Sequence, residues 1–156
     1  MENKSLSIDY TTFHSLDEMN SEDVRLIKEA VSMLDNSYAP YSHFNVGSAV
    51  MLDDKTIVRG SNQENAAYPS GLCAERTALF SAGANYPKQA IRKIAIAGRN
   101  ESNIFQAAFP CGSCRQVLSE YEHLAKQPIS IIIFKNEKEI YVFNGVSSLL
   151  PFGFEF

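Results

Sequence analysis

The three cysteines of this chain lie in two short motifs that can bind a metal ion. Cys73 opens the sequence Cys-Ala-Glu-Arg, and Cys111 and Cys114 lie in the sequence Pro-Cys-Gly-Ser-Cys. Three thiolates can hold Zn²⁺ and leave its fourth position for a water molecule, whereas structural zinc sites have four protein ligands. Glu75, two residues after the first cysteine, adds a carboxylate that can move a proton of that water. This combination predicts a hydrolytic zinc enzyme.

Both cysteine motifs are predicted to begin helices, over 73–84 and 111–121. The backbone N–H groups and the dipole at a helix start favour a thiolate over a thiol. Three thiolates leave a zinc site with a net negative charge, which weakens the pull of the metal on a bound water. Arg76 and Arg115 stand beside the two motifs, and an arginine that donates to a zinc-bound sulfur would offset this charge.

A structural zinc site is the alternative interpretation of the cysteines. One of the three histidines, His14, His43 or His123, would then be the fourth ligand. Such a site has no use for Glu75, so we favour the hydrolytic interpretation.

Composition and charge favour an ordinary globular protein that acts on small molecules. Of the 156 residues, 21% are charged and 45% hydrophobic, which is typical of a single globular domain. The formal net charge is −4 and Lys and Arg are scattered, so we expect no nucleic-acid partner. The longest apolar stretch, 129–134, is too short to span a bilayer, so we expect no membrane partner. The uneven cysteine count and the lack of a secretory pattern over 1–20 predict a cytoplasmic protein.

Hydrophobic periodicity predicts an α/β fold. Asn20, with Asp23 three residues later, is typical of a helix start, and apolar residues on one face extend that helix to about residue 37. We expect one mixed sheet of about five strands, because strands and helices alternate after a hairpin. The predicted strands are 44–52, 56–60, 91–98, 129–134 and 139–143.

The two ends of the chain are less typical of a compact domain. We assign 1–20 to an N-terminal extension and 21–156 to a catalytic domain. Within the extension, Leu6, Ile8 and Tyr10 alternate with polar residues, which predicts a short edge strand. Residues 149–156 are so apolar that we expect either the core or another subunit to cover them.

Four motifs occur together and in a specific order. They are Ser37-Tyr38-Ala39-Pro40-Tyr41-Ser42 with Phe44, Val46 and Gly47; Gly60 and Asn62 with Glu64-Asn65-Ala66-Ala67-Tyr68; Cys73-Ala74-Glu75-Arg76-Thr77-Ala78; and Pro110-Cys111-Gly112 with Cys114-Arg115-Gln116-Val117-Leu118. In these motifs the chain resembles the small homotetrameric cytidine deaminases of the three-cysteine zinc type, within the cytidine and deoxycytidylate deaminase family. The resemblance runs from about residue 22 to Leu149-Leu150-Pro151 and Phe154. It implies an α/β/α sandwich around a mixed five-stranded sheet.

The resemblance implies hydrolysis of cytidine and 2′-deoxycytidine to uridine and 2′-deoxyuridine plus ammonia, in pyrimidine salvage. It implies one Zn²⁺ per chain on Cys73, Cys111 and Cys114, and attack of zinc hydroxide on C4 of the base. Glu75 would shuttle protons from the water to N3 and then to the departing ammonia, and Arg76 would offset the thiolate charge.

Substrate-binding roles follow from the same resemblance. Asn62 and Glu64 would grip the ribose 3′-hydroxyl, although without the motif they would be expected in a solvated loop. Phe44 would form an aromatic wall, or else pack in the core. Tyr68 would complete the pocket or contribute across a subunit boundary, and the backbone of Ala74 would donate to the base carbonyl.

The resemblance also implies a homotetramer whose active sites are shared between subunits. Phe154 would stack on the base in the site of a neighbouring subunit, and its alternative is a hydrophobic plug within its own subunit. Two rival functions stay open: deamination of another aminopyrimidine nucleoside, such as the antibiotic blasticidin S, and a structural zinc module. A nucleotide substrate is disfavoured because no basic cluster lies near the motifs.

Overall fold

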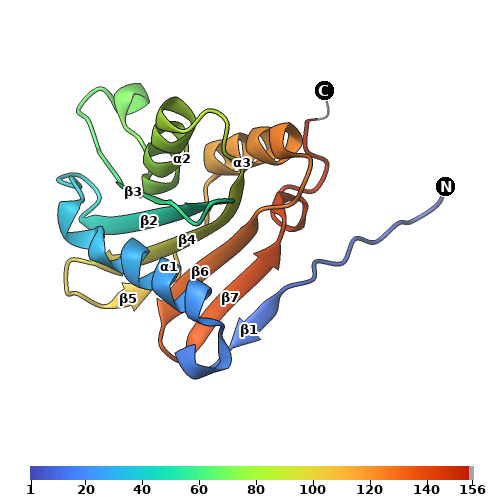
Figure 1. The fold of residues 1–156 in the computed structure, drawn as a ribbon, viewed down its shortest axis with the longest axis horizontal. Helices are drawn as coiled ribbons and strands as arrows, with labels where there is room; N and C mark the ends of the chain where they lie inside the picture. The colour runs from blue at the N-terminus through green and yellow to red at the C-terminus, as the bar shows by residue number, and fades with distance from the viewer. Residues whose placement is uncertain (155–156) are drawn as a thin grey trace.

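A central seven-stranded sheet carries three α-helices in the computed structural model, which describes residues 1–154 (Figure 1). The strands are β1 (Thr11–Phe13), β2 (Phe44–Leu52), β3 (Ile57–Ser61), β4 (Ile91–Asn100), β5 (Phe105–Gln106), β6 (Ser130–Asn136) and β7 (Glu139–Asn144). The α-helices are α1 (Ser21–Ser32), α2 (Ala74–Asn85) and α3 (Gly112–Ala125). Short 3₁₀ helices are η1 (Leu16–Glu18), η2 (Leu34–Asn36), η3 (Tyr68–Ser70) and η4 (Val146–Ser148).

The sheet is mixed, as expected. Its order is β1-β7-β6-β4-β2-β3, with β5 paired to β4. The β4–β6 pair is parallel and is joined through α3, whereas the other pairs are antiparallel. A parallel pair needs a crossover connection, and this crossover brings the start of α3 to the same end of the sheet as the start of α2.

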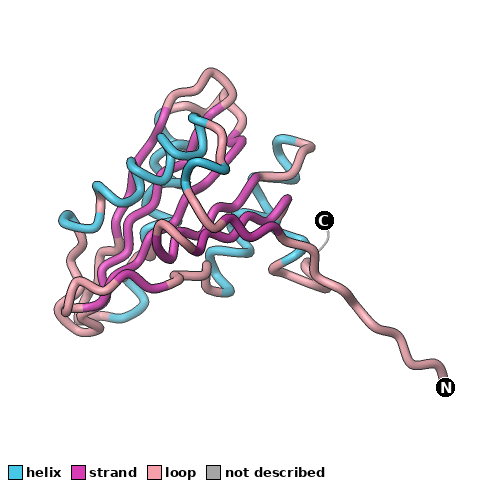
Figure 2. Tube along the Cα trace, turned by 90° about the horizontal axis from the view of Figure 1, so that it is seen from below, coloured by secondary structure: helices cyan, strands magenta, loops and turns pink. Residues whose placement is uncertain are grey.

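Alternating side chains along the strands build a separate hydrophobic core on each face of the sheet. On β2, Ala49 and Met51 pack with α1, whereas Val50 and Leu52 pack with α2 and α3. This alternation is the side-chain period of a strand that is buried on both faces. Figure 2 shows helical segments on either side of the strands. The expected α/β/α sandwich is therefore confirmed.

The number of strands differs from the five that were expected. All five predicted strands are present, and β1 and β5 are additional. β5 has two residues, which is too short to show a hydrophobic period. The edge strand expected around Leu6, Ile8 and Tyr10 forms instead at Thr11–Phe13. Its partner β7 ends at Asn144, so the register leaves no β7 backbone opposite residues 1–8.

The first helix begins as predicted and ends earlier. The side chain of Asn20 caps it, since its Oδ1 accepts a hydrogen bond from the backbone N–H of Asp23 at 2.9 Å. The α-helix ends at Ser32 rather than near residue 37, and η2 continues the path. Leu34, on η2, is still buried against the sheet, which explains the longer apolar pattern.

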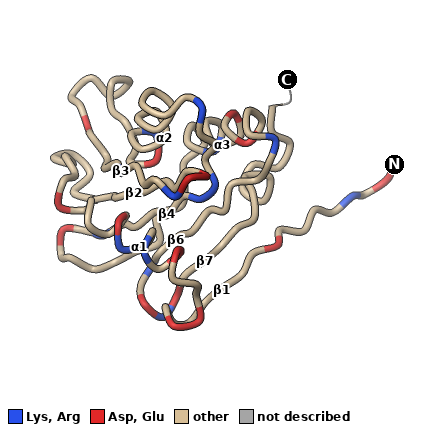
Figure 3. Tube along the Cα trace, viewed as in Figure 1, with Lys and Arg blue, Asp and Glu red and all other residues tan. Residues whose placement is uncertain are grey.

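Charges and the N-terminal residues complete the description. Basic and acidic residues are interspersed along the chain (Figure 3). None of the helices in residues 1–154 combines the length and hydropathy needed to cross a bilayer. Residues 1–10 contain no helix or strand, and the part of this segment nearest the N-terminus extends away from the rest of the molecule (Figures 1 and 2).

Candidate active site

The three cysteines meet where α2 and α3 begin. Cys73 and Cys111 are the N-cap residues of these two helices, and Cys114 lies in the first turn of α3. The Sγ atoms of Cys73 and Cys111 are 3.8 Å apart, and those of Cys111 and Cys114 are 3.5 Å apart. All three sulfurs lie within 4.8 Å of one another.

This geometry fits a zinc ion. Zn–S bonds of about 2.3 Å at tetrahedral angles place the sulfur atoms about 3.8 Å apart. Among residues 1–154, no histidine or further cysteine joins this cluster. Three sulfur ligands leave the fourth position of a tetrahedral ion open, which is the arrangement of catalytic rather than structural zinc.

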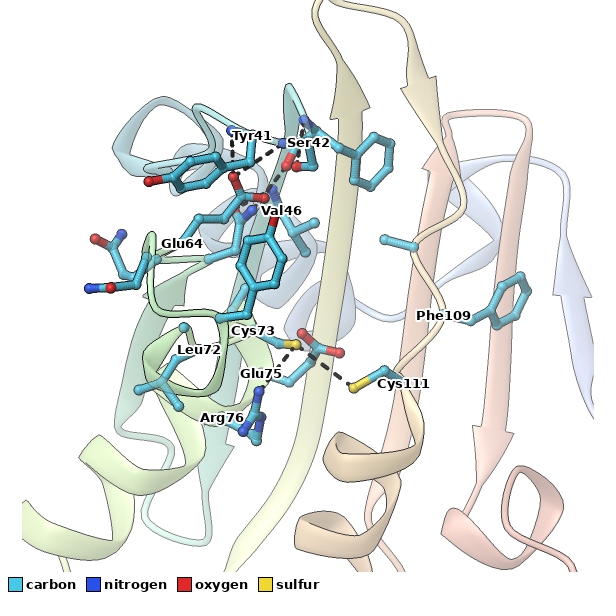
Figure 4. Close-up of a pocket in the computed structure, with 18 of the residues that line it drawn as sticks. Tyr41, Ser42, Val46, Glu64, Leu72, Cys73, Glu75, Arg76, Phe109 and Cys111 are labelled. Carbon is cyan, nitrogen blue, oxygen red and sulfur yellow. Dashed lines mark hydrogen bonds between the residues drawn. The ribbon is translucent and has the colours of Figure 1, made fainter.

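The cysteine cluster lies in a pocket of about 790 Å³ (Figure 4). The loop after η2, the start of β2, the loop between β3 and α2, and the segment before α3 form its walls. The residues lining it are Tyr41, Ser42, Phe44, Val46, Asn62, Gln63, Glu64, Asn65, Tyr68, Gly71, Leu72, Cys73, Ala74, Glu75, Arg76, Ala107, Ala108, Phe109 and Cys111. The volume and the mixture of apolar and polar walls suit a small-molecule ligand.

Glu75 is buried in this pocket beside the cysteines. It is 4% exposed, and its carboxylate lies next to the sulfur of Cys73 (Figure 4). Burial, with a further contribution from the negative charge of Cys73, raises the pKa of Glu75 to about 7. A carboxyl group with this pKa can both accept and release a proton near neutral pH.

Arg76 lies beside the cysteine cluster. Its Nη2 lies 3.6 Å from the Sγ of Cys73. Hydrogen bonds from the Cys114 thiol and from Arg76 lower the pKa of Cys73 to about 5, although burial opposes them. The same Cys114–Cys73 hydrogen bond, together with burial, raises the pKa of Cys114. Of these two thiols, Cys73 therefore ionises first.

Arg115 does not take the role that was expected for it. Its Nε donates to the carbonyl oxygen of Pro110 at 2.8 Å, and its Nη1 donates to the carbonyl oxygen of Leu149 at 2.7 Å. Arg115 thus ties the C-terminal segment to the turn that carries Cys111.

Asn62 and Glu64 both line the pocket, and both also hold its backbone in place. The Asn62 side chain accepts from the N–H of Val46 and donates to the carbonyl of Phe44, each at 2.9 Å. Glu64 Oε2 accepts from the N–H of Tyr41 at 2.9 Å and of Ser42 at 3.2 Å (Figure 4).

The acidity of Glu64 reflects these contacts. Burial acts to raise its pKa, but hydrogen bonds from the Ser42 hydroxyl and from the Tyr41 and Ser42 amides outweigh it, so the pKa is lowered. Glu64 is therefore ionised and anchored at neutral pH.

Three other predicted substrate contacts also lie in the pocket. Phe44 is half-buried at the start of β2, and Ala74 is fully buried at the start of α2. Tyr68, on η3, is 78% exposed at the rim, and its ring meets that of Tyr41 edge-on at 6.2 Å. Phe154 is not among the residues that line the pocket of its own chain. It is 71% exposed and lines a separate depression with His123 on α3.

Two parts of the pocket had no predicted role. The Tyr41-Ser42 turn forms one wall through its contacts with Glu64, and Ala107 to Phe109 form another. The second segment follows a strand of two residues, so no periodicity marks it.

Known proteins with similar sequences and structures were found. Residues 20–131 match the family described as the cytidine and deoxycytidylate deaminase zinc-binding region. The chain is 35% identical over 130 residues to the cytidine deaminase of Sporosarcina psychrophila, which covers 83% of this chain and 89% of that protein. It is 41% identical over 95 residues to the cytidine deaminase of Halalkalibacterium halodurans, covering 61% and 68%.

Similarity to solved structures extends over a comparable part of the chain. The 1.6 Å crystal structure of the Burkholderia pseudomallei cytidine deaminase superposes with a TM-score of 0.71 at 35% identity, covering 87% of this chain and all of the other. The Mycobacterium leprae cytidine deaminase gives 0.63 at 32% identity, covering 85% and 99%. From its cysteine cluster, its pocket and these matches, the chain belongs to the cytidine and deoxycytidylate deaminase family.

Proposed function

We propose that this protein is a zinc-dependent hydrolase that converts cytidine and 2′-deoxycytidine to uridine and 2′-deoxyuridine with release of ammonia. The observation that carries the proposal is the cluster of three sulfurs within 4.8 Å of one another, beside a buried glutamate in a pocket. The similarity to proteins named cytidine deaminase supports cytidine as the substrate. We assign the catalytic role to residues 21–156.

Cys73, Cys111 and Cys114 hold one Zn²⁺ per chain in this proposal. When bound, zinc supplies a Lewis acid that makes a water molecule acidic enough to react near neutral pH. Glu75 would accept one proton from the attacking water and give it to N3 of the pyrimidine. It would then take the second proton of the same oxygen and deliver it to the amino group that leaves C4 as ammonia. Its pKa of about 7 suits both directions of transfer.

The walls of the pocket bind the nucleoside. Glu64 accepts a hydrogen bond from the ribose 3′-hydroxyl through a lone pair that its backbone contacts do not use. Asn62 donates to the same hydroxyl through the N–H that is not bound to the backbone. Phe44 and Tyr68 enclose the base and sugar, and the backbone N–H of Ala74 donates to the base carbonyl. Binding through the 3′-hydroxyl is compatible with both ribose and deoxyribose.

A homotetramer completes the site in this proposal. Phe154 lies outside the pocket of its own chain and is exposed, and in this proposal it stacks on the base in a neighbouring subunit. We assign the reaction to pyrimidine salvage in the cytoplasm, where thiolates of this kind stay reduced.

Glu75→Gln provides the direct test. The purified, zinc-loaded protein is incubated with cytidine, and in parallel with 2′-deoxycytidine, while uridine and ammonia are measured. Glu101→Gln, at an exposed glutamate of the β4–β5 turn, is the matched control. We expect Glu75→Gln to keep its zinc and lose at least about 10²-fold in kcat, because general acid–base catalysis contributes that much or more.

Each result has a definite meaning. Near-normal turnover by Glu75→Gln would show that the proton-transfer assignment is wrong. A wild-type protein that holds zinc yet converts neither nucleoside would turn attention to other aminopyrimidine nucleosides such as blasticidin S. If pyrimidine nucleosides also left its melting temperature unchanged, a structural zinc module would remain.

A further inference from the structure

Four aromatic side chains gather at the outer edge of the sheet, next to the segment 107–111 that carries Cys111, which we call the metal loop. They are Tyr10, Phe109, Tyr141 and Phe143, which we call the aromatic cluster. Tyr10 lies 5.4 Å from Phe143 and 6.1 Å from Tyr141, measured between ring centroids. Phe109 lies 5.7 Å from Tyr141 and 6.3 Å from Phe143. These separations are typical of rings that attract one another in tilted or edge-to-face arrangements.

β1 brings Tyr10 to this cluster. In its pairing with β7, Thr11 lies opposite Val142 and Thr12 opposite Tyr141. One further step in the same register places Tyr10 opposite Phe143, on the face of the sheet that carries α2 and α3. Cross-strand neighbours of this kind are the basic unit of sheet stabilisation. The position of Tyr10 is therefore set by β1.

Phe109 connects the cluster to the metal loop. It directly precedes Pro110 and Cys111, and together with Ala107 and Ala108 it forms one wall of the pocket. In Figure 4 its ring points away from the cysteines. The ring is thus an anchor on the outer side of a segment whose inner side faces the site.

We infer that Tyr10 is a positioning residue, which acts through the Tyr141–Phe143 pair to hold Phe109 and hence the loop that carries Cys111. This inference rests on the proposed zinc site. Residues 1–19 lie outside the part of the chain that matches the family, and the inference gives this N-terminal extension a role.

Because the Tyr10 and Phe109 rings are partly exposed, we expect removal of the Tyr10 ring to affect the structure only locally. Tyr10 is 56% and Phe109 is 47% exposed, whereas Phe143 is 5% exposed. Removal of the Tyr10 ring uncovers one side of the aromatic pair without opening a cavity in the core. Loss of the ring should therefore loosen the metal loop more than it destabilises the fold.

The test compares Tyr10→Ala, Tyr10→Phe and Ile8→Ala in the zinc-loaded full chain. Ile8 is an exposed apolar residue of the same extension and provides the control. The rate of zinc release to a colorimetric chelator is measured, together with kcat and KM for cytidine, the urea unfolding curve and the molecular mass in solution. Tyr10→Ala should release zinc roughly two- to tenfold faster, the range that corresponds to loss of an aromatic pair.

Two further comparisons test whether Tyr10 acts through its ring and through Phe109. Tyr10→Phe keeps the ring and should release zinc at the wild-type rate, as should Ile8→Ala. Phe109→Ala should also speed release, and adding Tyr10→Ala to it should have little further effect, because both act through the same contact.

The outcomes separate the inference from the proposed function. Wild-type release by Tyr10→Ala, or acceleration accompanied by a change in molecular mass, would overturn the role of Tyr10 while leaving the zinc site intact. Failure of the wild-type protein to retain zinc, or retention of it by Cys111→Ser, would instead contradict the proposed site itself.

Discussion

Arg115 donates from its Nε to the carbonyl oxygen of Pro110, at a distance of 2.8 Å. The second arm of the guanidinium reaches the carbonyl oxygen of Leu149 at 2.7 Å. Two planar donors from one rigid group therefore fix the distance between the metal loop and the segment that leads to the C-terminus.

Arg115→Lys tests how much the two hydrogen bonds of the Arg115 guanidinium stabilise the protein. Lysine keeps the charge but cannot present two donors in fixed directions, so one carbonyl loses its partner. We expect the free energy of unfolding to fall by about 1–3 kcal/mol, the cost of an unsatisfied half-buried group. Urea unfolding measures the change, and Arg92→Lys, at an exposed position on β4, is the control. Equal free energies of unfolding for the two variants would show that the two hydrogen bonds of Arg115 do not stabilise the fold.

Arg76→Gln should weaken metal binding. The guanidinium lies against the sulfur of Cys73 and helps to lower its pKa to about 5. Without it the thiolate loses a charged donor, and we expect zinc affinity to fall by about 10–100-fold, as for other groups that support metal ligands. Competition with a chelator measures the affinity. Arg59→Gln, which removes a surface ion pair with Glu29, should leave it unchanged.

Gly60→Ala should displace the helix that carries Cys73 and Glu75. A Cβ at this position would lie 2.5 Å from the backbone nitrogen of Ala78 and 2.6 Å from the carbonyl oxygen of Ala74. Neither backbone atom can yield without a shift of α2. We expect a loss of about 1–3 kcal/mol in stability, the usual cost of overpacking, together with reduced turnover.

Gly112→Ala is the steric control for Gly60→Ala. Apart from the adjacent residues and the backbone of its own helix, no atom of the described residues lies within 4 Å of a Cβ built at this residue, which begins α3. Alanine should leave the free energy of unfolding unchanged or raise it slightly, because it restricts the unfolded chain. Similar losses in the two variants would show that contact with α2 is not the cause.

Glu122→Gln should change how stability depends on pH. The carboxylate accepts from the N–H groups of Ile129 and Val146, both at 2.8 Å. Burial raises the pKa of Glu122, although these bonds oppose the shift. The folded state therefore holds the proton more tightly, and the stability that this gives at low pH is lost as the pH rises through the folded-state pKa.

Glutamine keeps an acceptor oxygen and removes the ionisation. Relative to the wild type, Glu122→Gln should therefore gain stability as the pH is raised from about 4 to about 7. Urea unfolding at the two pH values tests this expectation. Glu120→Gln, at an exposed position on the same helix, should change in stability between the two pH values by the same amount as the wild type. The same result for Glu122→Gln would show that the pKa of Glu122 is not raised in the folded state.

The chemistry of the site could be predicted from the sequence because it depends on residue types at short spacings. Cys111 and Cys114 lie one helical turn apart, and Glu75 follows Cys73 on α2. The five main strands were also predictable, because burial on both faces produces long apolar runs with β-branched residues. Short spacings and apolar runs of this kind can be recognised in the sequence without knowledge of the fold.

Features that depend on distant contacts could not be predicted. The second role of Asn62, as a bridge to the backbone of β2, follows from the pairing of β2 with β3. The direction of Arg115 depends on where the C-terminal segment returns. The shift of the first strand from Leu6–Tyr10 to Thr11–Phe13 depends on where β7 ends. Periodicity carries no information about such partners.

The distribution of the metal ligands along the chain also has a consequence for biosynthesis. Cys73 is separated from Cys111 by 38 positions, and α2, β4 and β5 lie between the two ligands. During synthesis, Cys73 is made before Cys111 and Cys114. Capture of the ion by all three thiolates must therefore wait until the starts of α2 and α3 have come together, so a bound metal marks a chain in which these two helix starts are in place.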